Sequence, residues 1–169
     1  MAPGPSAADP EGAAGPLRET DRVSTVRIER VGVQATYDLR ARVLRQGRPV
    51  QTTGDDAPSA IHLAALLDDR VVGVVRFQPQ TCPWRDAEYA WQLRGMATDP
   101  EVRGIGAGRA LVAEGLVQIS RAGADLVWCD AREAAVGFYE KIGFTVVSEA
   151  YDMPPVGLHL GMVLDLPIR

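Results

Sequence analysis

The 169-residue sequence contains only two cysteines, two histidines and one lysine. Cys82 and Cys129 are too few and too far apart in the chain for a disulfide framework or a cysteine metal site, so we expect no bound metal. Proteins with so little cysteine are typical of a reducing compartment. We therefore expect a cytoplasmic protein.

The sequence also lacks a long hydrophobic run and an excess of positive charge. No stretch approaches the ~18 consecutive apolar residues of a membrane span. The N-terminus lacks the basic region and apolar core of a secretion signal. The formal net charge is -4 and the isoelectric point is near 5.2, which disfavours a partner held mainly through phosphate contacts. We expect neither a membrane nor a nucleic acid as partner.

Hydrophobic residues make up 46% of the chain and charged residues 24%, a composition typical of one globular domain. Residues 1–20 are different, because they are mostly Pro, Gly and Ala with almost no large apolar side chain. Such a segment cannot bury enough surface to offset the entropy lost on ordering. We expect a flexible tail over residues 1–20 and a single domain over residues 21–169.

Hydrophobic periodicity along the domain alternates between strand and helix patterns. It predicts a mixed α/β (α+β) sheet with helices on its faces, in the order β-α-β-β-β-α-β-α-β-β. The predicted strands are Val23–Val31, Ala60–Leu67, Val71–Phe77, Tyr89–Ala97, Leu126–Asp130, Phe144–Ala150 and Leu158–Leu166. The predicted helices are Gln34–Arg45, Gly106–Arg121 and Glu133–Ile142.

The most informative stretch runs from a predicted strand through a glycine-rich loop into a helix, with the sequence RGMATDPEVRGIGAGR over Arg94–Arg109. Glycine lets the backbone approach a ligand closely, and the free N–H groups at a helix start attract an anion. Arg103 and Arg109 flank the loop without a carboxylate between them. A phosphate or pyrophosphate fits this arrangement, although glycines that serve only a turn and a close helix contact are the alternative.

Spacing excludes two common phosphate loops. A Walker loop needs Lys and Ser or Thr after its last glycine, and the dinucleotide fingerprint needs a third glycine where Arg109 stands.

Two motifs resemble the GNAT superfamily of acyl-CoA-dependent N-acyltransferases. Arg103-x-x-Gly106-x-Gly108 is similar to its Gln/Arg-x-x-Gly-x-Gly/Ala signature, and FYEKIGF over Phe138–Phe144 is similar to its downstream hallmark. The resemblance covers nearly all of the chain except the tail. It implies a mixed, mostly antiparallel central sheet of about seven strands flanked by helices, with acetyl-CoA as cosubstrate.

The resemblance also implies roles for individual residues. The strand before the loop would bind the pantetheine arm, and the loop amides would bind the pyrophosphate. Tyr139 would protonate the departing thiolate. The family often has Asn where this chain has Arg132, so a pantetheine contact there is lost, or Arg132 turns to the 3'-phosphate end or pairs with an acid. The cofactor-binding residues implied are Met96, Ala97, Thr98, Arg103, Gly104, Ile105, Gly106, Ala107, Gly108, Arg109 and Arg132.

An amine acceptor is protonated at neutral pH and needs a base before it can attack the thioester. We favour His159, on the last predicted strand, because an imidazole can take a proton near neutral pH. A hydrogen-bonded core histidine is the alternative. The other candidate bases are His62, Glu88, Glu149 and Asp152.

Other side chains each have a structural and a functional interpretation. Cys129 lies in an apolar strand and is expected to be a buried structural thiol rather than an acylated nucleophile. Arg42 and Arg45, three residues apart, form a solvated helix face or guide an anionic acceptor. The aromatics Trp84, Trp91, Tyr89 and Tyr151 are core or acceptor-pocket residues.

Two functions therefore follow from the sequence. The first is an acetyltransferase that moves an acetyl group from acetyl-CoA to a primary amine of a small molecule or peptide. The alternative is a catalytically degenerate acyl-CoA-binding domain with a sensor or scaffold role. A homodimer stays open as a further partnership.

Overall fold

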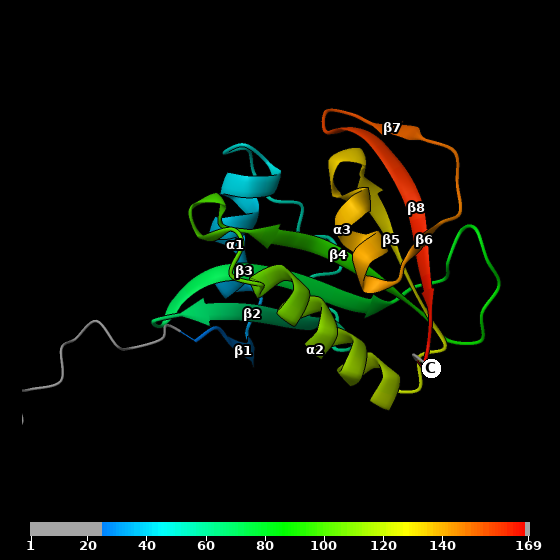
Figure 1. Ribbon diagram of the computed structural model, residues 1–169, viewed down its shortest axis with the longest axis horizontal. Helices are drawn as coiled ribbons and strands as arrows, with labels where there is room; N and C mark the ends of the chain where they lie inside the picture. The colour runs from blue at the N-terminus through cyan, green and yellow to red at the C-terminus, as the bar shows by residue number, and fades with distance from the viewer. Residues whose placement is uncertain (1–24, 168–169) are drawn as a thin grey trace, which may run out of the picture.

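Eight strands form one sheet in the computed structural model, which describes residues 25–167 (Figure 1). Their order across the sheet is β1-β2-β3-β4-β5-β8-β6, and β7 also pairs with β8. All neighbours are antiparallel except β4 and β5. The expected mixed, mostly antiparallel sheet is confirmed. The strands are β1 (Arg27–Arg30), β2 (Ile61–Leu67), β3 (Arg70–Pro79), β4 (Ala90–Thr98), β5 (Leu126–Arg132), β6 (Thr145–Val146), β7 (Tyr151–Met153) and β8 (Gly157–Asp165).

The helices cover both faces of this sheet. Helix α1 (Gln34–Leu39) continues as a π-helical turn (Arg40–Leu44), α2 spans Ala107–Arg121, and α3 (Val136–Ile142) follows a 3₁₀ turn (Glu133–Ala135). Leu39 of α1 packs with Val74, whereas Leu111 of α2 packs with the adjacent Val75. Because successive strand residues point to opposite faces, α1 and α2 lie on opposite faces of β3 (Figure 1).

The predicted strand Phe144–Ala150 is wrong in extent, because β6 contains only Thr145 and Val146. After β6 the Val147 N–H still donates to the Gly161 carbonyl at 2.9 Å, but the Gly161 N–H donates to Ser148 Oγ at 2.7 Å in place of a backbone acceptor. The chain then forms β7, which periodicity did not predict because it has only three residues. The predicted tail over residues 1–20 and the start of the first predicted strand lie outside the described residues.

Strands β4 and β5 pair only at their beginnings. Ala90–Gln92 is in register with Leu126–Trp128. Beyond these residues β4 continues to Thr98 and β5 to Arg132, but the two strands no longer pair with each other. On its other edge β4 has a bulge, since two residues, Gly95 and Met96, lie opposite Val75 of β3. A bulge bends its strand and takes backbone groups out of the ladder. The two strands therefore separate in the middle of the sheet.

Candidate functional site

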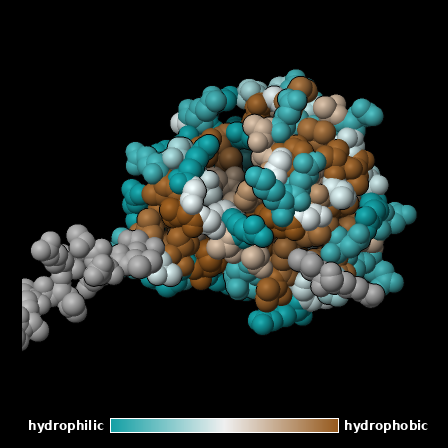
Figure 2. Space-filling model, viewed as in Figure 1, coloured by the Kyte–Doolittle hydropathy of each residue, from teal (hydrophilic) through white to brown (hydrophobic). Residues whose placement is uncertain are grey.

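A cleft of about 860 Å³ opens where β4 and β5 stop pairing. Its lining includes Leu93 and Tyr139, which belong to the core on the α2 face, and also Gln92 and Asp130. Gln92 precedes Leu93 on β4 and so points to the α1 face. The cleft thus passes between the strands from one face of the sheet to the other. In Figure 2 the surface is hollowed between the part that carries α1 and the part that carries α3.

A glycine turn at the start of α2 forms one end of this cleft. Gly104 and Gly106 have φ angles of 84° and 80°, and no atom lies within 4 Å of the position that a Cβ would take on either. The first intrahelical bond of α2 runs from the Ala110 N–H to the Gly106 carbonyl at 3.0 Å. The N–H groups of residues 107–109 therefore have no intrahelical partner. Free amides, the positive helix end and open space above glycine together form an anion cradle.

The cofactor-binding residues predicted from the sequence lie together in this cleft, with one exception. Ile105 is 44% exposed and does not line it. Arg132 lines the cleft, and its guanidinium donates to the Leu44 carbonyl at 2.7 Å rather than pairing with an acid. Burial and the charge of Arg45 lower the pKa of Arg132. Lining residues from the predicted set are Met96, Ala97, Thr98, Arg103, Gly104, Gly106, Ala107, Gly108, Arg109 and Arg132.

Tyr139 on α3 lies in the wall of the cleft and is 5% exposed. Its ring packs edge-on against Phe138 and Phe144, with ring centroids 5.1 and 5.4 Å apart. Among the described residues its hydroxyl has no hydrogen-bond partner. Burial, and then the neighbouring Cys129, raise the pKa of Tyr139 well above its ordinary value. The hydroxyl therefore holds its proton and is available as a donor.

His159 on β8 also lines the cleft and is 6% exposed. Its Nδ1 lies 2.8 Å from the Gly157 carbonyl, which can only accept a hydrogen bond. Nδ1 therefore carries a proton, and in the neutral ring Nε2 keeps its lone pair. His62 does not line the cleft, and its Nε2 lies 2.8 Å from the Asp55 carbonyl.

Three carboxylates considered as bases also lie outside the lining of the cleft: Glu88, Glu149 and Asp152. Glu88 borders a separate cavity of about 320 Å³.

The structure adds a carboxylate that the sequence argument did not assign to the site. Asp130 on β5 lines the cleft and accepts hydrogen bonds from the Tyr151 hydroxyl and, at 3.2 Å, from Gln92 Nε2. Tyr151 also stacks beside His159, with ring centroids 6.2 Å apart. The signal available in the sequence was a lone acid that ends the apolar run over Leu126–Cys129. Only the fold brings Tyr151 and Gln92 to that acid.

Three arginines that were not among the predicted site residues also line the cleft. Arg40 and Arg76 are buried, and both pair with Asp55, which is 4% exposed. Arg94 is exposed and lies opposite Arg76 in the β3–β4 register. Partial desolvation and the charge of the facing Arg76 lower the pKa of Arg94.

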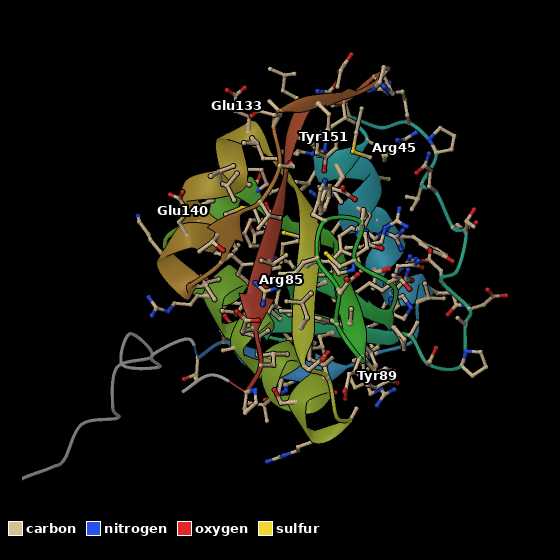
Figure 3. The ribbon with its side chains drawn as sticks, turned by 90° about the vertical axis from the view of Figure 1, so that its right-hand side faces the viewer. Arg45, Arg85, Tyr89, Glu133, Glu140 and Tyr151 are labelled. Carbon is tan, nitrogen blue, oxygen red and sulfur yellow. The ribbon has the colours of Figure 1, made fainter. Side chains whose placement is uncertain are left out.

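Of the two helix arginines considered earlier, only Arg45 lines the cleft. Arg42 instead pairs with Asp38 at 3.0 Å. The aromatic candidates for the acceptor pocket do not line the cleft directly. Trp91 is buried in the core, and Figure 3 shows Tyr89 far from Tyr151 and Arg45. Burial raises the pKa of the Cys129 thiol, which is 1% exposed and stays protonated.

Known proteins share this fold and sequence pattern. A sequence model of the Acetyltransferase (GNAT) family matches residues 27–144. The chain belongs to this family. The GNAT chain is 31% identical over 142 residues to YitI of Bacillus subtilis (strain 168), which is described as an uncharacterized N-acetyltransferase. The match covers 82% of this chain and 95% of YitI. The resemblance to the GNAT superfamily is therefore confirmed, and the protein is an N-acetyltransferase in class.

Two solved structures show the same fold at low identity. FeeM, an N-acyl amino acid synthase from uncultured soil microbes, superposes with a TM-score of 0.74 at 13% identity, covering 87% of this chain and 93% of FeeM. An aminoglycoside 6'-N-acetyltransferase complexed with coenzyme A superposes with a TM-score of 0.66 at 15% identity, covering 85% of this chain and 98% of that enzyme.

Within residues 25–167 no helix is long and apolar enough to cross a membrane. Over the same residues, no three His, Cys, Asp or Glu side chains are grouped as a metal ion would require.

Proposed function

We propose that this GNAT protein transfers an acetyl group from acetyl-CoA to a primary amine by direct attack of the amine on the thioester. The observation that carries the proposal is the anion cradle at Gly104–Gly106, which lies at the end of a cleft lined by a buried phenol and an imidazole. The cradle would bind the phosphates of a coenzyme. Tyr139 and His159 would carry the proton transfers of a reaction.

The cleft has groups suited to each part of acetyl-CoA. The free N–H groups at residues 107–109, with Arg103 and Arg109, would bind the pyrophosphate. Backbone groups of Met96, Ala97 and Thr98 would bind the pantetheine arm along β4. The bulge in β4 at Met96 takes backbone groups out of the β3–β4 ladder. A strand amide there would polarise the thioester carbonyl.

The proposed reaction uses His159 and Tyr139 for its proton transfers. The acceptor ammonium first gives one proton to His159 Nε2, which passes it to solvent, and the nitrogen lone pair then forms a bond to the thioester carbon. His159 Nε2, neutral again, takes the second proton from that nitrogen as the carbon–sulfur bond breaks and returns it to water. The Tyr139 hydroxyl donates a proton to the leaving thiolate and is reprotonated afterwards from water. The products are an acetamide and free coenzyme A, with one proton released to solvent.

Asp130 would stabilise the ammonium form of the acceptor before attack. It is the only carboxylate in the lining contributed by the described residues, and both of its oxygens already accept one hydrogen bond. A carboxylate oxygen has two lone pairs, so each can accept one more. We also place the activity in the cytoplasm, as expected for a chain whose two cysteines are both free. A homodimer stays a prediction.

Two measurements on the same protein sample test this function. Calorimetric titration with acetyl-CoA measures binding, and a colorimetric thiol assay measures coenzyme A released in the presence of a panel of amines. We expect binding, and release that depends on the amine. Binding without release from any amine would instead support the acyl-CoA-binding sensor or scaffold. Propionyl-CoA in the same assay measures how strictly the acyl group is acetyl.

A further inference from the structure

The cleft has far more positive than negative side chains in its wall. Asp130 is the only carboxylate that the described residues contribute to the lining. Besides Arg103 and Arg109 near the glycine turn, five other arginines line the cleft: Arg40, Arg45, Arg76, Arg94 and Arg132. The two near the turn are accounted for by the pyrophosphate of the proposed cosubstrate. Arg132 belongs to the predicted cofactor-binding set, so Arg40, Arg45, Arg76 and Arg94 require a separate explanation.

Two of these arginines share a single carboxylate. Asp55 accepts from Arg40 at 2.9 Å through one oxygen and from Arg76 through the other. The three residues are each less than a tenth exposed, and together their side chains keep one unit of positive charge. The buried Nε of Arg76 has no hydrogen-bond partner among the described residues. A buried donor without an acceptor is unfavourable.

Arg94 adds a further positive charge beside this group. It lies directly opposite Arg76 in the β3–β4 register, so the two side chains point to the same face of the sheet. No carboxylate of the described residues lies within 4.0 Å of its guanidinium. Like charges on opposed strand positions are destabilising. A bound anion would remove this repulsion.

The arginines and the anion cradle lie on different faces of the sheet. Phe77 of β3 contacts α2, since a Cβ on Gly115 of that helix would come within 2.1 Å of its ring. Its neighbour Arg76 therefore points to the α1 face, together with Arg94. Gln92 shares that face and donates to Asp130. The α1 face of the cleft thus combines the Arg94 guanidinium and the buried Arg40–Asp55–Arg76 group with one lining carboxylate, away from the start of α2.

We propose that the acceptor is a small amine that also carries a carboxylate, as an amino acid or a short peptide does, and that Arg94 binds this carboxylate. The inference rests on the amine acetyltransfer proposed above. A guanidinium has a planar fork of donors that matches the two oxygens of a carboxylate. Asp130 on the same face accepts from the ammonium of the same molecule. A polyamine or another polycation would meet several positive groups and only one negative group.

A panel of matched acceptors tests this assignment on the full chain. Each amino acid is compared with its amide and with the amine obtained by removing its carboxyl group. O-phosphoethanolamine represents a phosphate-bearing amine, and spermidine a polycation. The thiol assay gives kcat and KM for each acceptor at saturating acetyl-CoA. Calorimetry on the protein loaded with coenzyme A gives acceptor binding independently of turnover.

Two variants at Arg94 and one elsewhere complete the test. Arg94→Gln removes the charge at an exposed position and should raise KM for the best amino acid about 10- to 100-fold. Arg94→Lys keeps the charge without the fork and should recover part of the loss. Arg42→Gln, outside the cleft and paired with Asp38, is the matched control and should leave KM unchanged. Acetyl-CoA affinity should be the same in all three.

The outcomes separate this inference from the transferase proposal. A preference for acids over amides that disappears in Arg94→Gln supports it. Equal activity on acids, amides and simple amines overturns it while the transferase proposal stands. Preference for O-phosphoethanolamine overturns the carboxylate in favour of a phosphate. If no amine is acetylated, acid-selective binding that Arg94→Gln abolishes still supports the inference, and its absence overturns it.

Discussion

The Tyr151 hydroxyl on β7 donates a hydrogen bond to the Asp130 carboxylate on β5, although β8 lies between these two strands. Gly161 is the β8 residue opposite Asp130. A Cβ there would come within 2.7 Å of the Trp84 indole, whose ring lies 5.9 Å from that of Tyr151. A glycine on the intervening strand β8 therefore leaves room for the aromatic packing beside this bond. The short strand β7 thus supplies one of the two side chains that hold Asp130 in the cleft.

Tyr151→Phe should impair the amine side of the reaction and leave the coenzyme side intact. Asp130 then keeps only the Gln92 donor, so its orientation toward the acceptor is less well fixed. We expect KM for the amine to rise about 3- to 10-fold and acetyl-CoA affinity to stay unchanged. Steady-state kinetics and calorimetry measure the two quantities. Tyr89→Phe, at an exposed tyrosine far from the cleft, is the control. An equal rise in that variant would contradict a positioning role.

Gly106→Ala should weaken acetyl-CoA binding at least about tenfold. Gly106 has a φ of 80° at the start of α2, a conformation that strains any residue with a Cβ. The added methyl meets no protein atom within 4 Å, so it would project into the space proposed for the pyrophosphate. Calorimetry gives the affinity, and circular dichroism checks the fold. Unchanged affinity in a folded variant would remove the pyrophosphate assignment.

The residues proposed to bind the cofactor could be predicted from the sequence to lie together, because they are nearly contiguous in the chain. One strand, one loop and one helix start carry residues 96–109, so local spacing determines which groups meet. The acceptor half could not be predicted in this way. Arg40, Arg76 and Asp130 come from a π-helical turn and two strands, and only the sheet register places them together. A pattern of period two shows that two residues share a face of one strand, but it carries no information about the facing strand.

The ends of helices and strands could be predicted only where the local sequence pattern, and not a tertiary contact, determines them. Helix α2 has a clear apolar face and begins within one residue of its predicted start. The segment after α3 has the β-branched pattern of a longer strand, yet it leaves the ladder when Ser148 accepts the Gly161 N–H. That side-chain contact is specific to the tertiary structure. Local propensity could not reveal it.

Asp125→Asn should destabilise the fold at neutral pH but not in acid. The Asp125 carboxylate accepts the Glu88 and Tyr89 N–H groups at 2.8 and 2.9 Å, next to the point where β4 and β5 pair. Burial opposes the ionised form, but the backbone hydrogen bonds outweigh it and lower the pKa of Asp125. A lowered pKa in the folded state stabilises the protein above the unfolded value of about 3.9, and this stability is lost as pH falls through the folded pKa.

The expected loss for Asp125→Asn is about 1 kcal/mol at pH 7, since the group is partly exposed. Urea unfolding at pH 7 and at pH 2.5 measures it. The difference in free energy of unfolding between the variant and the parent protein should be smaller at the lower pH. Asp86→Asn, an exposed neighbour with no hydrogen-bond partner among the described residues, should have no effect at either pH. If this difference did not depend on pH, the loss of stability would come from packing and not from the charge of Asp125.

His159→Gln and His62→Gln form a matched pair, because both imidazoles are 6% exposed and only His159 lines the cleft. Glutamine can still donate a hydrogen bond but cannot act as a base near neutral pH. We expect His159→Gln to lower kcat about 10²- to 10⁴-fold with acetyl-CoA affinity unchanged. The glutamine amide in His62→Gln can still donate to the Asp55 carbonyl, so kcat should be unchanged in that variant. Equal kcat in both variants would place the base elsewhere, with Asp130 as the next candidate.

Tyr139→Phe should affect the leaving group and not coenzyme binding. The substitution removes only the hydroxyl, which has no partner among the described residues, and keeps the ring between Phe138 and Phe144. Turnover should fall about 10²- to 10⁴-fold, as for a lost general acid, while acetyl-CoA affinity stays within about twofold. Single-turnover measurement with the best acceptor is required, since slow product release would hide part of the loss. Weaker binding with normal turnover would mean that the hydroxyl only holds the coenzyme. No change in either quantity would leave Tyr139 as a core residue.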